Sequence, residues 1–147
     1  MTDDLTTIEL DHFYPHPPEK VWQALTTPDL FARWLMPATG FAPVPGTEFR
    51  MRAQPMPGVG FSGKVRGIVL EAIAPKRLSM TWNDAESEIE TGWVITWQLE
   101  PEGTGTRVLF SHSGFDPDDE GSQQVRAIMS KGWAGIATGL GAVAGAV

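Results

Sequence analysis

The 147-residue chain contains no cysteine, and this absence excludes disulfide bonds, thiol catalysis and thiolate metal sites. It fits a reducing compartment, so we expect a cytoplasmic protein. The chain also lacks a run of about 18 uninterrupted apolar residues, so no membrane span is predicted. Its acidic opening, MTDDLTTIEL, lacks the apolar run of a secretory signal.

Basic residues are scarce as well. The chain has 11 Lys and Arg against 18 Asp and Glu, which gives a formal net charge of −7, and no Lys/Arg cluster offsets that average. This balance argues against nucleic acid or an anionic membrane surface as partner, because both require basic patches. The length and the 41% of apolar residues fit a single globular domain over residues 1–147.

The periodicity of apolar residues predicts an α+β domain. Alternating apolar and polar residues predict a first strand. Prolines suited to a first helical turn then predict two short helices, and a period of two after them predicts five more strands. The last segment has apolar residues every three or four positions, from Val125 to Val147, which predicts one long helix. The expected strands cover residues 6–15, 47–53, 63–73, 77–83, 92–100 and 106–113, and the two short helices cover 17–27 and 28–34.

One face of the predicted sheet is unusually aromatic, and two interpretations of it stay open. Either tryptophans fill a solid core under the last helix, or a curved sheet encloses a cavity for an apolar ligand. Glycine and alanine in the covering helix favour the cavity, because small side chains leave space. The residues that alternation places on this face include Phe49, Met51, Leu78, Met80, Trp82, Trp93, Ile95, Trp97, Leu99, Val108, Phe110 and His112.

Three short motifs do not form the sites they resemble. GVGFSG, residues 58–63, matches a dinucleotide-binding string, but a strand follows it where that site needs a helix, so we predict a hairpin loop. His12 and His16 have the spacing of a helical metal pair, yet prolines between and after them exclude a regular helix. We therefore predict no metal site and no cofactor. In SHS, Ser111 and Ser113 point away from His112, which argues against a nucleophile–base pair.

His112 is the polar residue of the aromatic face and allows two interpretations. It is either a core histidine satisfied by a hydrogen bond, or the group that orients a ligand or acts as an acid/base catalyst.

Four stretches of the chain resemble the helix-grip superfamily, which includes the birch-pollen allergen and START domains. They are PPEKVWQALTTPDLFARW, GIVLEAIAPKRLSMTW, VITWQLEPEGTGTRVLFSHSGF and the pair Gly132-Trp133. The match is closest to the domain related to the C-terminal part of the Hsp90 ATPase activator. The resemblance implies a curved antiparallel sheet gripping a long C-terminal helix, with an elongated cavity between them.

The resemblance also implies where a ligand would bind, although the family shares no catalytic motif that could be carried over. Matching strands and helix gives a cavity wall of Trp34, Phe49, Met51, Trp82, Trp93, Trp97, Phe110, His112 and Trp133. We therefore predict a protein that binds a hydrophobic or amphipathic small molecule. The alternatives are a cyclase-like or hydrolase-like enzyme with His112 as acid/base, and a co-chaperone-type module. Hsp90 is the less expected partner, since the activator's N-terminal domain has no room in this length.

The C-terminal segment departs from the family pattern. Residues 132–147, GWAGIATGLGAVAGAV, carry no charge, whereas relatives have leucine, alanine and charged residues there. Gly135 and Gly139, and likewise Gly141 and Gly145, are spaced four apart. We expect this uncharged second face to be covered by another subunit in a homodimer.

Overall fold

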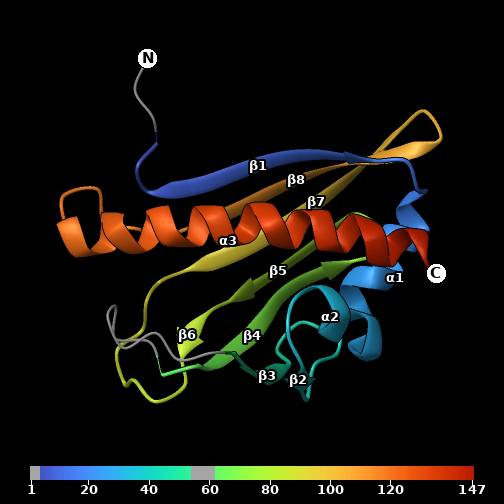
Figure 1. The fold of residues 1–147 in the computed structure, drawn as a ribbon. Helices are drawn as coiled ribbons and strands as arrows, with labels where there is room; N and C mark the ends of the chain where they lie inside the picture. The colour runs from blue at the N-terminus through green and yellow to red at the C-terminus, as the bar shows by residue number, and fades with distance from the viewer. Residues whose placement is uncertain (1–3, 54–61) are drawn as a thin grey trace.

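The computed structural model of the chain describes residues 4–53 and 62–147, which form one antiparallel sheet with three helices over one of its faces (Figure 1). The α+β helix-grip architecture is therefore confirmed. The strands are β1 (Thr7–Tyr14), β2 (Ala38–Thr39), β3 (Glu48–Arg52), β4 (Lys64–Ile73), β5 (Arg77–Thr81), β6 (Asn83–Asp84), β7 (Val94–Glu102) and β8 (Gly105–Ser113). The helices are α1 (Pro18–Thr26), α2 (Pro28–Trp34) and α3 (Glu120–Gly145).

The strand order in the sheet is β1-β8-β7-β5-β4-β3-β2, with β6 paired to β4 beside this path. The six predicted strands correspond to β1, β3, β4, β5, β7 and β8. Sequence analysis missed β2 and β6, because each has two residues and alternation cannot be recognised over so short a length. Of the predicted GVGFSG hairpin, residues 58–61 lie outside the described part of the chain.

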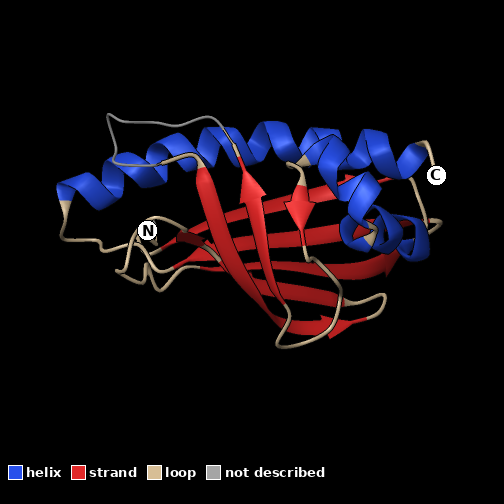
Figure 2. Ribbon diagram, turned by 90° about the horizontal axis from the view of Figure 1, so that it is seen from below, coloured by secondary structure: helices blue, strands red, loops and turns tan. Residues whose placement is uncertain are grey.

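The register of the strands places the predicted aromatic side chains on one face. Phe110 of β8 pairs with Leu10 of β1 and with Trp97 of β7, which in turn pairs with Leu78 of β5. A register shift between Val69 and Glu71 interrupts the pairing of β4 with β5. Such a bulge bends a strand. Figure 2 shows α3 running across the strands on this face, with α1 and α2 packed at one end.

The two short helices follow the signals in the sequence. Pro18 begins α1, where its missing N–H costs nothing, and Val21, Ala24 and Leu25 are buried. Thr27 separates α1 from α2 in an extended conformation. Its carbonyl accepts from the backbone N–H of Phe31 at 2.8 Å, but its side chain makes no cap hydrogen bond.

Helix α3 is fastened to β1 near both ends of that strand. At the start of β1, the Arg126 guanidinium donates to the Thr7 carbonyl at 3.0 and 3.1 Å. At the end of β1, the Tyr14 hydroxyl donates to the Ala137 carbonyl at 2.6 Å. The helix itself begins where the Asp119 carboxylate accepts from the backbone N–H of Ser122 at 2.8 Å. These contacts hold α3 across the sheet.

The predicted apolar stripe of α3 lies against the sheet, with Trp133 and Leu140 buried and Ile136 half-buried. The expected end of the stripe differs, because α3 ends at Gly145 and Val147 lies beyond it. In the described residues, no helix combines the length and hydropathy that a membrane span requires.

The prediction that the glycines of α3 form one uncovered face is wrong at three positions. A Cβ on Gly141 would lie 2.6 Å from the Tyr14 ring, and one on Gly145 would lie 3.0 Å from the ring of His16. A Cβ on Gly139 would lie 3.7 Å from Trp34. These glycines therefore admit side chains of the same chain. A Cβ on Gly135 would have no neighbour within 4 Å, so this position is open.

Candidate functional site

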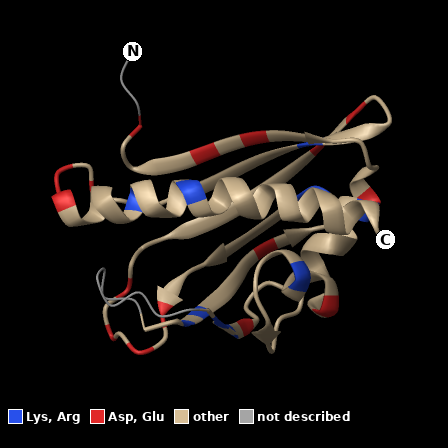
Figure 3. Ribbon diagram, in the orientation of Figure 1, with Lys and Arg blue, Asp and Glu red and all other residues tan. Residues whose placement is uncertain are grey.

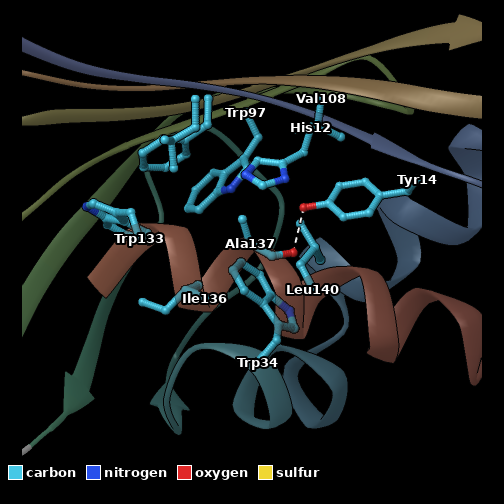
Figure 4. A pocket seen from close by; sticks show the side chains of 11 residues that line it. His12, Tyr14, Trp34, Trp97, Val108, Trp133, Ile136, Ala137 and Leu140 are labelled. Atoms are coloured by element: carbon cyan, nitrogen blue, oxygen red, sulfur yellow. Dashed lines mark hydrogen bonds between the residues drawn. The ribbon is translucent and has the colours of Figure 1, made fainter. Parts of the chain in front are cut away.

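A small cavity lies between the sheet and α3, at the position expected of a helix-grip ligand site (Figure 4). Its volume is about 10 Å³, room for roughly one water molecule. The side chains around it are almost all apolar. They belong to Leu10, His12, Tyr14, Trp34, Trp97, Val108, Phe110, Trp133, Ile136, Ala137 and Leu140.

Four of the nine residues predicted for the cavity wall line this space. They are Trp34 of α2, Trp97 of β7, Phe110 of β8 and Trp133 of α3. The structure places the other five elsewhere in the core, and they are Phe49, Met51, Trp82, Trp93 and His112. That any of the nine contacts a ligand stays a prediction.

The five residues outside the cavity are covered by other parts of the chain. The Phe49 ring packs on Phe41 with centroids 5.3 Å apart, and it also lies where a Cβ on Gly67 would come within 2.5 Å of it. Trp93 packs against His112 and Phe115 at the far end of the sheet. The inward-facing side chains of the sheet therefore divide among the cavity and two aromatic clusters. One cluster contains Phe41 and Phe49, and the other contains Trp93, His112 and Phe115.

Sequence analysis missed the contribution of β1. Leu10, His12 and Tyr14 alternate along this strand and all three line the cavity. The signal was present, because the alternation that predicted the strand also placed Leu10 and His12 on one face. What it did not show is that β1 pairs with β8 and so lies next to Phe110 and Val108.

Trp133 is the centre of the aromatic packing under α3. Its ring lies 4.6 Å from that of Phe110, 5.5 Å from that of Trp82 and 6.0 Å from that of Trp97. These are separations at which tilted and edge-on aromatic pairs stabilise each other. The Trp133 indole therefore sets the distance between α3 and the sheet at one end of the cavity.

His112 holds this indole in place. The Trp133 Nε1–H donates to His112 Nδ1 at 2.9 Å, so the proton of the neutral imidazole is on Nε2. Nε2 is buried and has no hydrogen-bond partner among the described residues. Burial lowers the pKa of His112 from 6.5 to about 3.

This environment does not suit His112 to acid/base catalysis. Such a role requires a pKa near the working pH and a reacting group within hydrogen-bond reach. Its neighbours are instead the rings of Trp93 and Phe115, each with its centroid 4.6 Å from that of the imidazole, and no carboxylate in the described residues bonds to it. The interpretation of His112 as a hydrogen-bonded core histidine is the one the geometry fits.

Two polar side chains of β1, His12 and Tyr14, line the cavity, together with the Trp97 indole, whose N–H makes no hydrogen bond among the described residues. The His12 imidazole is half-buried and stacks on the Tyr14 ring, with centroids 6.1 Å apart and planes 10° apart. The Tyr14 hydroxyl donates to the Ala137 carbonyl, as the dashed line in Figure 4 marks. Burial raises the pKa of Tyr14 to about 12, so the phenol is neutral at physiological pH.

No group of three or more His, Asp or Glu side chains within residues 4–53 and 62–147 is placed to hold a metal ion. His12 and His16 are separated by their surroundings: His12 lines the cavity, whereas His16 packs against Gly145 at the end of α3. The chemistry this site offers is therefore apolar contact together with hydrogen bonds to an imidazole, a phenol oxygen and the Trp97 indole N–H.

Comparison with known proteins gives the family. A family model described as "Activator of Hsp90 ATPase homolog 1-like protein" matches residues 15–145. The chain belongs to this family. The resemblance recognised in the sequence is thus confirmed for the Hsp90 ATPase activator-like family, and the match covers the two short helices, the sheet from β2 to β8 and all of α3.

Solved structures of similar proteins share the whole fold. Protein MLL2253 from Mesorhizobium loti is 31% identical, with 93% of this chain and 95% of that chain covered and a TM-score of 0.79. A protein from Rhodobacter sphaeroides is 26% identical, with 100% and 97% covered and a TM-score of 0.77. The Aha1 dimer from Colwellia psychrerythraea is 26% identical, with 91% and 92% covered and a TM-score of 0.75. A search of curated proteins finds no match.

Proposed function

We propose that this activator-like domain binds a hydrophobic or amphipathic small molecule between the sheet and α3. The observation that carries the proposal is the cavity itself, which lies where helix-grip domains are expected to hold ligands and is lined by five aromatic rings, those of Tyr14, Trp34, Trp97, Phe110 and Trp133. Apolar burial would supply affinity at about 25 cal/mol per Å². The imidazole and the phenol of β1 would supply orientation.

Binding requires the closed cavity to open, and the middle of α3 is the part best suited to move. Gly132 and Gly135 have no neighbour within 4 Å of a would-be Cβ, so this side of the helix is not packed. Glycine also weakens a helix by about 1 kcal/mol relative to alanine at each position. Figure 3 shows that the half of α3 toward the C terminus carries no charged side chain, so no ion pair holds it down.

The proposal is tested by titrating 2-naphthol into the protein labelled with ¹⁵N and following the six tryptophan indole N–H signals by NMR. A ligand in the cavity shifts the signals of Trp34, Trp97 and Trp133, whose rings line it, and leaves that of Trp22 unchanged. Uniform shifts, or none at saturating 2-naphthol, would contradict the proposal.

A matched pair of variants locates the site. Ala137 lines the cavity, whereas Ala134 is exposed on the same helix, so Ala137→Leu fills the space and Ala134→Leu adds the same atoms outside it. We expect Ala137→Leu to weaken 2-naphthol binding at least tenfold and Ala134→Leu to leave it unchanged. Equal affinities for the two variants would place the ligand elsewhere.

Three further parts of the proposal concern context. The chain acts as one domain, which the family match over residues 15–145 supports, and it acts in the cytoplasm, for which the absence of cysteine is the support. It forms a homodimer, for which the support is that a relative from Colwellia psychrerythraea is an Aha1 dimer. Light scattering after size exclusion tests the dimer, and a monomer at every concentration would refute it. Hsp90 is not proposed as a partner, because no feature of the described surface favours it.

A further inference from the structure

We propose that the natural ligand carries a neutral hydroxyl group, and that this group lies between the Tyr14 hydroxyl and the His12 imidazole. This inference rests on the proposed function and narrows the class of ligand. It separates alcohols and phenols from hydrocarbons, ethers and carboxylates of the same size. It follows from where the hydrogen-bonding atoms of the cavity direct their protons and lone pairs.

The hydroxyl proton of Tyr14 is already committed. It is donated to the Ala137 carbonyl at 2.6 Å, a short bond between two groups that both line the cavity. A phenol has one proton to donate, so the oxygen of Tyr14 can offer a ligand only a lone pair. Any ligand atom bound to it must therefore be a donor.

The position of this oxygen is fixed by the close fit of the ring. Gly141 lies directly against the Tyr14 ring, with room for no Cβ, and the ring of His12 stacks on Tyr14 along β1. Turning the hydroxyl away would leave the buried ring in the same place and would break the bond to α3. The oxygen therefore remains an acceptor while the cavity is filled.

His12 supplies the complementary capacity. Its imidazole lines the cavity beside Tyr14, and within the described residues its ring nitrogens have no hydrogen-bond partner (Figure 4). A neutral imidazole has one N–H donor and one acceptor nitrogen. A ligand group placed between the two side chains must donate to Tyr14 and can accept from His12, and a hydroxyl group does both.

Ethers, hydrocarbons and carboxylates each fail one of these conditions. An ether accepts but cannot donate, and a hydrocarbon does neither. A carboxylate cannot donate, and its charge would enter a cavity walled by aromatic rings in a protein of net charge −7. Apart from the Trp97 indole N–H, the remaining side chains of the wall are apolar or have their polar atoms hydrogen-bonded, so the hydroxyl projects from a flat apolar body.

The experiment compares four probes of one shape by isothermal titration calorimetry: 2-naphthol, 2-methoxynaphthalene, 2-methylnaphthalene and naphthalene-2-carboxylate. We expect 2-naphthol to bind about fivefold more tightly than 2-methoxynaphthalene, the ratio that one net hydrogen bond of about 1 kcal/mol produces. The methyl compound should bind no better than the ether, and the carboxylate should be the weakest of the four.

Three variants test the assignment to β1. Tyr14→Phe removes the acceptor but retains a ring, and it should bring the ratio of 2-naphthol to 2-methoxynaphthalene affinity close to one. His12→Phe removes a donor that the hydroxyl and the ether can both use, so it should weaken both probes relative to 2-methylnaphthalene and leave their own ratio unchanged. His16→Phe is the control, because His16 does not line the cavity, and it should keep the wild-type ratio. The ratio is measured within one variant, so a general loss of stability in Tyr14→Phe cancels from it.

The outcomes separate this inference from the proposed function. If none of the four probes shifts the indole signals of Trp97 and Trp133, the proposed function fails. If all four bind with equal affinity and shift those signals, the proposed function stands and the hydroxyl inference is overturned. A preference for 2-naphthol over 2-methoxynaphthalene that persists in Tyr14→Phe also overturns it.

Discussion

Replacement of Gly141 by alanine should destabilise the protein although alanine is the better helix former. Gly141 lies in the interior of α3, where the replacement alone would gain about 1 kcal/mol. The new Cβ, however, would lie 2.6 Å from Cδ1 and 2.7 Å from Cε1 of Tyr14. Carbon atoms pack best at about 3.5–4.0 Å, so the ring must move by roughly 1 Å.

The displaced ring carries the Tyr14 hydroxyl with it and strains the 2.6 Å bond to the Ala137 carbonyl. Overpacking of a filled core costs about 1–3 kcal/mol and a lost hydrogen bond about 1 kcal/mol. Against the gain in helix propensity, the expected net loss in the free energy of unfolding is about 1–3 kcal/mol. Gly135→Ala, whose Cβ meets nothing within 4 Å, should instead gain about 1 kcal/mol.

The assay is urea unfolding at neutral pH, followed by tryptophan fluorescence and by circular dichroism of the helices. The two variants should move the midpoint in opposite directions, and their melting temperatures should differ in the same sense by about 2–4 °C for each kcal/mol. A Gly141→Ala protein as stable as Gly135→Ala would refute the assigned contact. As a further check, the cost of Gly141→Ala should largely disappear when Tyr14 is also replaced by alanine.

Three other predictions concern the buried imidazole, the indole that donates to it and the N-cap of α3. Because the pKa of His112 falls from 6.5 to about 3 on folding, the unfolded chain binds an extra proton between these pH values, so stability should fall by ~1 kcal/mol per unit as the pH drops below 6.5. In urea unfolding at pH 7 and pH 5, His112→Gln should lose less stability than the wild type over this interval, and equal losses would refute the assignment. Trp133→Phe removes the indole donor and leaves His112 Nδ1 buried without a partner, which should cost about 2 kcal/mol in the same assay, and a loss within error would count against that bond. Asp119→Ala should cost about 1 kcal/mol by removing the N-cap of α3, whereas the neighbouring change Asp118→Ala should be close to neutral, and similar costs for both would contradict the cap.

The face of each strand could be predicted from the sequence, because alternation depends only on local backbone geometry. The side chains of Trp97 and Phe110 are therefore where the pattern placed them. Which residues of that face meet at the cavity depends on where α3 crosses the sheet, and this is set by contacts far apart in the chain. Phe49 has the right alternation but is covered by Phe41. Phe41 belongs to a loop whose position no local pattern encodes.

The partner of His112 could not be predicted for a related reason. Alternation along β8 placed the imidazole on the inner face, but the donor comes from Trp133 on another element. A shift of α3 by one residue would turn this indole by about 100° around the helix axis and away from the imidazole. The same dependence explains why Gly141 was predicted to face outward: the sequence contains the glycine, but not the tyrosine ring that requires it.

The two attachments of α3 to β1 limit how the helix can move when a molecule enters the cavity. Arg126 ties the helix to the start of the strand and Ala137 ties it to the end, so helix and strand form a closed frame. The helix cannot rotate away from the sheet about one end unless an attachment breaks or β1 separates from β8. Strand β1 is paired with β8 from Thr7 to Tyr14. It can only arch between its fixed points. With both attachments intact, the part of α3 free to move is the stretch between them, about 16 Å long at the rise of an α-helix, and it carries Gly132 and Gly135.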